Sequence, residues 1–152
     1  MSEFVTASQV HLDMPPRPKA EVLDFLSKRA VQLGIGSDGA AIHAAFEARE
    51  EEGATGMVDG IAVPHAKSSA IDHASVIVLR FAGTIDDWET IDGSSVNLAI
   101  ALLVPDAEAG TTHLTILTQL ARAMMDDAFR AAIRSAAEPA EVADLINARL
   151  EA

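Results

Sequence analysis

Two long apolar segments constrain the fold of this chain more than any other feature of its sequence. Residues 74–81 read Ala-Ser-Val-Ile-Val-Leu-Arg-Phe, and residues 96–104 read Val-Asn-Leu-Ala-Ile-Ala-Leu-Leu-Val. Both segments are rich in β-branched and apolar residues and lack polar alternation, which is typical of strands that are buried on both faces. We therefore expect these two segments to form the centre of a sheet.

Amphipathic helices are predicted before this pair of strands. Apolar residues recur at spacings of three and four over residues 20–33, which predicts a helix that ends at Gly34. A second helix is expected to begin at a cap formed by Ser37 or Asp38 and to carry Arg49 near its C-terminal end. A short extended segment is expected at residues 10–13, ahead of a loop that contains three prolines.

Three further helices are predicted after the second apolar segment. Thr111 or Thr112 would cap the first of them, and a short helix near residues 129–133 and a last one over residues 139–150 follow. The apolar face of the first is predicted to carry Leu114, Leu117, Leu120, Ala121 and Met124. Because strands and helices do not follow a strict βαβ order, we expect an α/β sandwich. It would be a single domain over residues 1–152, with a mixed sheet of roughly five strands flanked by helices.

Composition excludes several classes of function. The 152 residues include 23 acidic and 11 basic side chains, a formal net charge of −12 that disfavours binding to nucleic acids and to membrane surfaces. The sequence has no cysteine, so disulfides, thiolate metal sites and cysteine nucleophiles are absent. No apolar run reaches the roughly 20 residues of a membrane span, and residues 1–6 do not resemble a secretion signal. We expect a cytoplasmic protein.

Residues 34–39 raise one alternative of a different class. Their sequence, Gly-Ile-Gly-Ser-Asp-Gly, has the GxGxxG spacing of dinucleotide-binding loops, in which Gly34, Gly36 and Gly39 would approach a pyrophosphate. In such loops a strand precedes the first glycine, whereas here a predicted helix leads into Gly34. We interpret the segment as a helix end, a turn and a helix start. A nucleotide-binding oxidoreductase is kept as the alternative.

Residues 53–65 form the strongest candidate for a functional site. They read Gly-Ala-Thr-Gly-Met-Val-Asp-Gly-Ile-Ala-Val-Pro-His. Gly56 and Gly60 allow close approach of the backbone, while Pro64 fixes its own φ angle and holds Val63 extended. The pattern predicts a stiff loop that presents the imidazole of His65, a side chain whose neutral form is nucleophilic near physiological pH.

The sequence favours no metal site and no cofactor. His65, His73 and His113 are the three histidines of interest for metal binding, but their spacing is irregular and lacks a metal-ligand signature.

The string Gly-Ile-Ala-Val-Pro-His at residues 60–65, preceded by Arg49-Glu50 and Thr55-Gly56, resembles the fructose/mannitol-type EIIA domain of the bacterial phosphotransferase system. The resemblance covers nearly the whole chain, because the helix at 20–33, Trp88, the strand ending at Pro105 and His113 follow in the family's order. It implies that His65 accepts a phosphoryl group from the carrier HPr and passes it to a cysteine of an EIIB partner, for uptake of a fructose-class sugar.

The resemblance also implies roles for three other residues. Arg49 would be the cation that faces the phosphoryl group, and its alternative role is a favourable charge near a helix end. Thr55 would donate its hydroxyl to a phosphoryl oxygen or orient the imidazole, or else serve ordinary turn chemistry. His113 would be a second active-site histidine, kept neutral by the positive end of a helix, or else an exposed residue of a first helical turn.

Two departures from the family pattern affect this loop. Ala54 stands where the family often has serine, and Val58 where it often has glycine. One hydroxyl contact and the path of the loop are therefore open.

The resemblance leaves two physiological roles to compare. Because the sequence lacks both a cysteine and a membrane span, EIIB and EIIC would be separate chains, and the protein would meet the membrane only transiently through them. The alternative is a regulator of the nitrogen branch, whose phosphorylation state controls partner binding without sugar transport. The sequence does not name the sugar.

Overall fold

The computed structural model of the chain describes residues 4–108 and 114–150. Within these residues five strands form one sheet: β1 (Val10–Met14), β2 (Ile61–Ala62), β3 (His65–Ser68), β4 (Ser75–Ile85) and β5 (Val96–Pro105). The order is β1-β4-β5-β2, and β3 also pairs with β5. The β4–β5 pair is antiparallel, while β1 on β4 and both β2 and β3 on β5 are parallel. The described residues thus have the predicted α/β fold with a mixed sheet.

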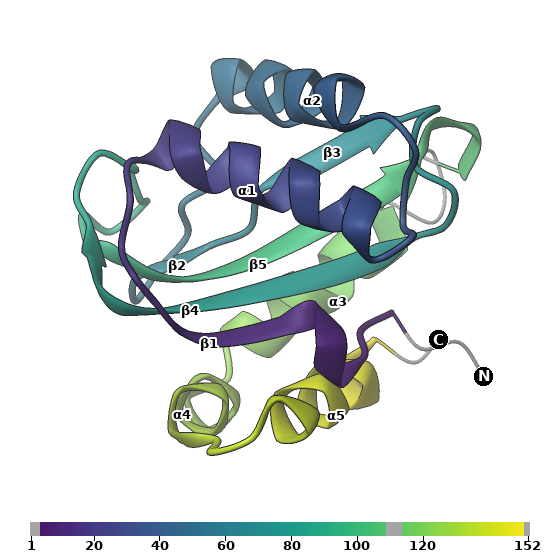
Figure 1. Cartoon of the computed structure of the whole chain (residues 1–152). Helices are drawn as coiled ribbons and strands as arrows, with labels where there is room; N and C mark the ends of the chain where they lie inside the picture. Colours follow the sequence, from purple (N-terminus) through teal and green to yellow (C-terminus); the bar gives the residue numbers. More distant parts are fainter. Residues whose placement is uncertain (1–3, 109–113, 151–152) are drawn as a thin grey trace.

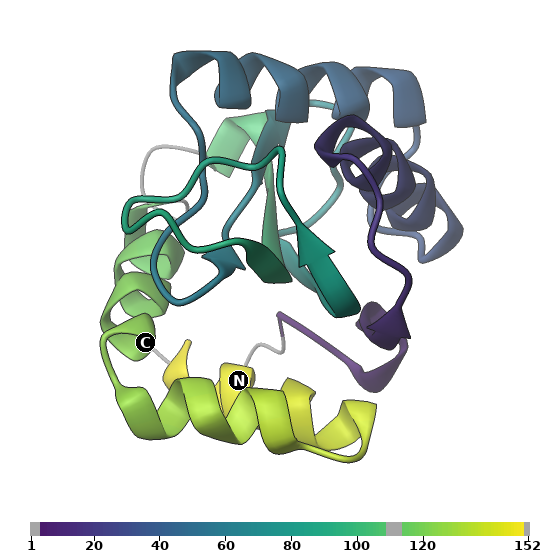
Figure 2. The same ribbon diagram turned by 90° about the vertical axis from the view of Figure 1, so that its left-hand side faces the viewer.

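Helices cover both faces of this sheet. Helices α1 (Lys19–Gln32) and α2 (Gly39–Glu52) lie on one face, and α3 (Leu114–Met124), α4 (Asp127–Ser135) and α5 (Pro139–Arg149) lie on the other (Figures 1 and 2). Two short 3₁₀ helices, η1 (Ala7–Gln9) and η2 (Asp106–Glu108), precede β1 and follow β5. None of the helices in the described part of the chain has the length and apolar character needed to cross a membrane.

Strand β5 explains why the apolar segments lack polar alternation. Its alternate residues Leu98, Ile100 and Leu102 belong to the core formed with α3, α4 and α5. The residues between them, Ala99, Ala101 and Leu103, belong to the core formed with α1 and α2. Since both faces of the strand are buried, apolar residues are favoured at nearly every position.

The helix predictions hold with small shifts. Of the two candidate caps for α2, Asp38 is the one used, and its carboxylate accepts from the N–H of Ala41 at 3.2 Å. The prediction that Leu114 faces the core is wrong, because this residue is 63% exposed at the start of α3. Ile116, Leu120 and Ala123 occupy the buried face instead. The predicted caps Thr111 and Thr112 lie outside the described residues.

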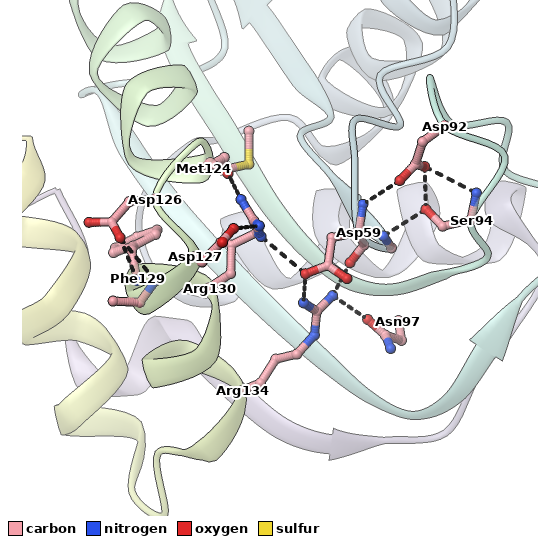
Figure 3. Close-up of polar contacts among 12 residues, drawn as sticks. Asp59, Asp92, Ser94, Asn97, Met124, Asp126, Asp127, Phe129, Arg130 and Arg134 are labelled. Carbon is pink, nitrogen blue, oxygen red and sulfur yellow. Dashed lines mark hydrogen bonds and ion pairs between the residues drawn. The ribbon is translucent and has the colours of Figure 1, made fainter.

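A polar cluster fastens the segment before β2 to α4 (Figure 3). Asp59 has a left-handed φ of 57°, and its carboxylate accepts from Nε of Arg130 at 3.0 Å and from Nη1 of Arg134 at 2.7 Å. The N–H of Asp59 donates to the Asp92 carboxylate at 2.9 Å, the main contact that holds the pKa of Asp92 well below its usual range. The entry to β2 is therefore fixed by α4 and by the turn at residue 92.

Gly60 is the glycine of this segment whose replacement tests the packing. Its φ is +72°, and an added Cβ would lie 2.7 Å from the carbonyl oxygen of Ser95. Gly93 has a similar φ of +78° but open space around the added atom. We expect Gly60→Ala to lower the free energy of unfolding by about 1–3 kcal/mol more than Gly93→Ala does, measured by urea denaturation. If both variants lose the same free energy of unfolding, backbone strain alone, and not the contact with Ser95, would account for the destabilisation.

Candidate functional site

His65 is the first residue of β3, at the edge of the sheet next to β5. It pairs with Leu102, whose N–H donates to the Pro64 carbonyl at 2.8 Å. The predicted loop at residues 53–65 therefore contains strand β2 and ends in strand β3, so sheet pairing adds to the stiffness that glycine and proline were expected to provide. Strands β2 and β3 lie on either side of Pro64 and both pair with β5. Proline has no N–H to donate, but its carbonyl still accepts a hydrogen bond from β5.

The close backbone approach predicted at Gly56 is confirmed. Gly56 bridges both Ala62 and Thr90, and an added Cβ would collide with the carbonyl oxygen of Glu89. The N–H of Val63 donates to the carbonyl of Thr55 at 2.9 Å. The chain before Pro64 is thus held on its other side by the start of the same loop.

The side chain of His65 is 6% exposed and lines a pocket of about 270 Å³. The other residues around this pocket come from α2 and β3: Ala45, Ala48, Arg49, Glu52 and Lys67. The alanines leave room beside the ring, because their side chains are short. The pocket holds two cations and one carboxylate beside the imidazole.

Strand alternation explains which way His65 faces. Ala66 belongs to the core on the α1 and α2 side, whereas Leu102 and Val104, the partners of His65 and Lys67, belong to the core on the α3 side. Neighbouring residues of a strand point to opposite faces. His65 and Lys67 therefore share the α3 face, and because β3 is at the sheet edge, α2 can flank them as well.

Arg49 lies in the last turn of α2 and reaches the same pocket as His65. Its Nη1 donates to the carbonyl of Gly53 at 2.8 Å, just past the end of the helix. A guanidinium has five N–H donors, so this bond leaves most of them for an anion. The structure thus brings together two of the residues that the sequence singled out.

Thr55 is placed differently from the expectation that it contacts a phosphoryl group directly. It is 3% exposed and is not among the residues that line the pocket. Its N–H donates to Oε1 of Glu50 at 3.2 Å, and its hydroxyl donates to Oε2 of the same carboxylate. The carbonyl of Thr55 accepts from the N–H of Val63, which links Thr55 to the chain that leads into His65.

Glu50 and Lys19 form a buried ion pair that sequence reasoning missed. Nζ of Lys19 lies 2.8 Å from Oε1 of Glu50, whose side chain is 6% exposed, and 5.6 Å from the centroid of the Trp88 ring. Glu50 stands beside Arg49 in the sequence, but a single charged residue near a helix end carries no signal of burial. Only the fold shows that it joins α1, α2 and the loop at Thr55.

The other histidines in the described part of the chain, His11, His43 and His73, are not among the residues that line this pocket. His11 on β1 accepts from Nε of Arg29 at 3.1 Å, and burial, followed by the Arg29 charge, lowers the pKa of His11. His43 pairs with Glu47 on α2. His113, the predicted second site histidine, lies outside the described residues. Among the residues that are described, no group of three or more histidine and acidic side chains could hold a metal ion.

Residues 34–39 form the predicted helix end and turn. Gly34 has a φ of +77° and directly follows the C-cap of α1, and its N–H donates to the carbonyl of Val31 at 3.1 Å. Asp38 then caps α2. Because a helix and not a strand precedes Gly34, the segment lacks the strand-to-helix geometry of a dinucleotide site.

Comparison with known proteins places this geometry in a family. Residues 3–149 match the family model described as "Phosphoenolpyruvate-dependent sugar phosphotransferase system, EIIA 2". The chain is 34% identical over 146 residues to the fructose-specific EIIA component of Haloferax volcanii, covering 96% of this chain and 94% of that one. It is 36% identical over 125 residues to the 2-O-alpha-mannosyl-D-glycerate-specific EIIABC component of Escherichia coli, covering 82% of this chain but only 19% of that longer protein.

Regulatory proteins are similar as well. The nitrogen regulatory protein of Klebsiella oxytoca is 33% identical over 147 residues, covering 96% of this chain and 86% of that one. The crystal structure of the nitrogen regulatory protein IIA-Ntr from Neisseria meningitidis superposes with a TM-score of 0.86 at 25% identity, over 95% of this chain and 97% of that one. A structure of mannitol enzyme IIA in complex with phosphorylated enzyme IIB from Escherichia coli shares the fold, with a TM-score of 0.76 at 20% identity, over 93% and 96% of the two chains.

Thr55→Val tests the hydrogen bond to Glu50. The substitution keeps the shape of the side chain but removes the hydroxyl, so the buried carboxylate loses a donor. We expect the free energy of unfolding to fall by about 1–3 kcal/mol, measured by chemical denaturation at neutral pH. Thr84→Val, at an exposed position of β4, is the matched control and should change stability by no more than about 0.5 kcal/mol. A loss at Thr55 no larger than the control's would contradict the assigned bond.

Proposed function

Because the chain belongs to the EIIA 2 family of the phosphoenolpyruvate-dependent sugar phosphotransferase system, we propose that His65 accepts a phosphoryl group from phosphorylated HPr and passes it to a cysteine of EIIB. One observation carries the assignment to these residues. His65 and Arg49 line the same pocket at the edge of the sheet. The proposal treats residues 1–152 as one phosphocarrier domain.

The chemistry consists of two in-line displacements at phosphorus. A lone-pair nitrogen of neutral His65 attacks the phosphorus carried by the HPr histidine, so one P–N bond forms as the other breaks and each ring keeps the proton on its second nitrogen. The EIIB thiolate then attacks the same phosphorus, an S–P bond forms, and His65 leaves as neutral imidazole. Such transfers need positioning and stabilisation of the phosphoryl charge more than covalent help from the protein.

Arg49 stabilises the charge on the phosphoryl oxygens in this scheme. Its bond to the Gly53 carbonyl fixes the guanidinium while leaving donors directed to the pocket. Charge-assisted hydrogen bonds of this kind are about twice as strong as neutral ones.

Thr55 and His113 have supporting roles in the proposal. Thr55 is a positioning residue. It binds the Glu50 carboxylate, and its carbonyl accepts from the N–H of Val63, in the segment that leads into Pro64 and His65. His113 is the second histidine that helps to hold the phosphoryl group, a role supported by the family resemblance.

The partners follow from the same relay. A relative of the same fold forms a complex with phosphorylated enzyme IIB, which supports EIIB as the acceptor. We place the protein in the cytoplasm, with transient contact at the membrane through EIIB and the membrane component EIIC. The net charge of −12 suits brief docking on basic faces of such carriers.

Two roles fit this phosphocarrier chemistry. We favour transport of a fructose-class sugar, supported by the Haloferax volcanii relative, which the chain matches over nearly its whole length. A regulatory role in the nitrogen branch is the second candidate, favoured by the similarity to the nitrogen regulatory proteins of Klebsiella oxytoca and Neisseria meningitidis.

His65→Gln tests the site, because glutamine keeps polarity but has no nucleophilic nitrogen. With enzyme I, HPr and radioactive phosphoenolpyruvate, we expect the native protein to gain an acid-labile phosphate and the variant to gain none. His73→Gln, an exposed histidine outside the pocket, is the control and should label normally. Full labelling of His65→Gln would refute the assignment.

Adding EIIB, EIIC and sugar to the labelled native protein separates the two roles, since a transporter component passes its phosphate to a sugar and a regulator retains it.

Arg49→Gln tests the proposed cation. We expect phosphoryl transfer from HPr to slow by about 10²-fold, measured by rapid-quench labelling, because the transition state loses its guanidinium donors. Arg49→Lys should recover part of the rate, since the charge returns without the planar donor geometry. Arg17→Gln, an exposed arginine before α1, should leave the rate unchanged. Equal rates for native and Arg49→Gln protein would remove Arg49 from the mechanism.

A further inference from the structure

The His65 pocket holds a second cation with no assigned role. Lys67 lies two residues after His65 on β3 and lines the same pocket. Within the part of the chain that the structure describes, its ammonium takes part in no hydrogen bond or ion pair. Other lysines differ: Lys19 pairs with Glu50, and Lys28 pairs with Asp24.

The geometry of β3 brings Lys67 within reach of a group bound to His65. Residues two apart on a strand point to the same face and are separated by roughly 7 Å, at about 3.3 Å per residue. A lysine side chain spans a similar length, and Lys67 is exposed, so its ammonium is able to move toward the ring. Ala45 and Ala48 on the facing side of α2 leave space for a phosphoryl group between them.

The charges of the side chains that line the pocket favour a role for Lys67 in binding an anion. A phosphoryl group brings about −1.5 to −2 charges at neutral pH. Glu52 is the carboxylate that lines the pocket, and its charge offsets that of Arg49. With Lys67 included, the lining has a net positive charge before phosphorylation. Without it, the charged side chains of the described lining, Arg49 and Glu52, would carry no net positive charge to meet the phosphoryl group.

We propose that the ammonium of Lys67 binds a phosphoryl oxygen on phosphorylated His65, together with Arg49, and stabilises the phosphorylated state of the protein. This inference rests on the proposed function, because it requires His65 to carry phosphate. It assigns Lys67 to the phosphoryl group itself and not to the surface of a protein partner.

The experiment uses isolated phosphorylated protein, so that partner docking plays no part. Native protein, Lys67→Met and Lys67→Arg are labelled with enzyme I, HPr and phosphoenolpyruvate and then freed of both carriers. The phosphorus NMR signal is followed against pH. We expect the phosphoryl group of Lys67→Met to titrate at higher pH than that of native protein, because a nearby cation favours the more highly charged form. Lys67→Arg should restore the native titration.

The equilibrium with HPr gives a second measurement. We expect Lys67→Met to shift it about tenfold toward phosphorylated HPr, since the acceptor loses one charge-assisted bond. Lys28→Met, at an exposed lysine of α1, should shift neither measurement. If Lys67→Met carries phosphate and both its titration and its equilibrium with HPr match those of native protein, the role of Lys67 is refuted while the phosphocarrier function stands. The same conclusion holds if the substitution changes only the rate of docking with HPr. If native protein gains no phosphate, both are refuted.

Discussion

The structure around His65 depends on the parallel pairing of residues 61–68 with β5. Strand β5 is buried on both faces, and it fixes β2 on one side of Pro64 and β3 on the other. Because β3 has no strand on its outer side among the described residues, its first side chain lies both in the sheet and at its rim. A rigid backbone and a ring that lines a pocket are combined at one residue.

Sequence patterns were sufficient for the parts of the fold that depend on local chemistry. The apolar runs identified β4 and β5, glycine marked the end of α1, and proline with glycine located His65. Strand β3 was not predicted, because its four residues, His-Ala-Lys-Ser, include only one apolar side chain and owe their conformation to pairing with β5. Leu114 was assigned to the core because helical periodicity predicts the direction of the apolar face but not its exact limits along the helix.

The site was predictable only in part for a similar reason. The family resemblance identified His65 and Arg49, and the fold places both at one pocket. Glu50 is buried by contacts with Lys19 of α1, which is distant in sequence, and with Thr55, which lies in a turn. No local sequence pattern predicts either contact. The sequence left open whether the hydroxyl of Thr55 contacts a phosphoryl oxygen or the imidazole, or serves turn chemistry, and in the structure it donates to the Glu50 carboxylate. Long-range pairing of charged side chains is where single-sequence reasoning ends.

The ion pair between Lys19 and Glu50 has a consequence for how anions reach the site. It offsets the charge of Glu50 at the end of α2, so the charged groups that line the pocket among the described residues are Arg49, Glu52 and Lys67. The molecule as a whole carries twelve surplus negative charges, which repel a free anion once it comes within a screening length of roughly 8 Å of the surface. A phosphate ion that diffuses alone meets this repulsion close to the surface, whereas a phosphoryl group carried by a docked protein is brought directly to the cations of the pocket.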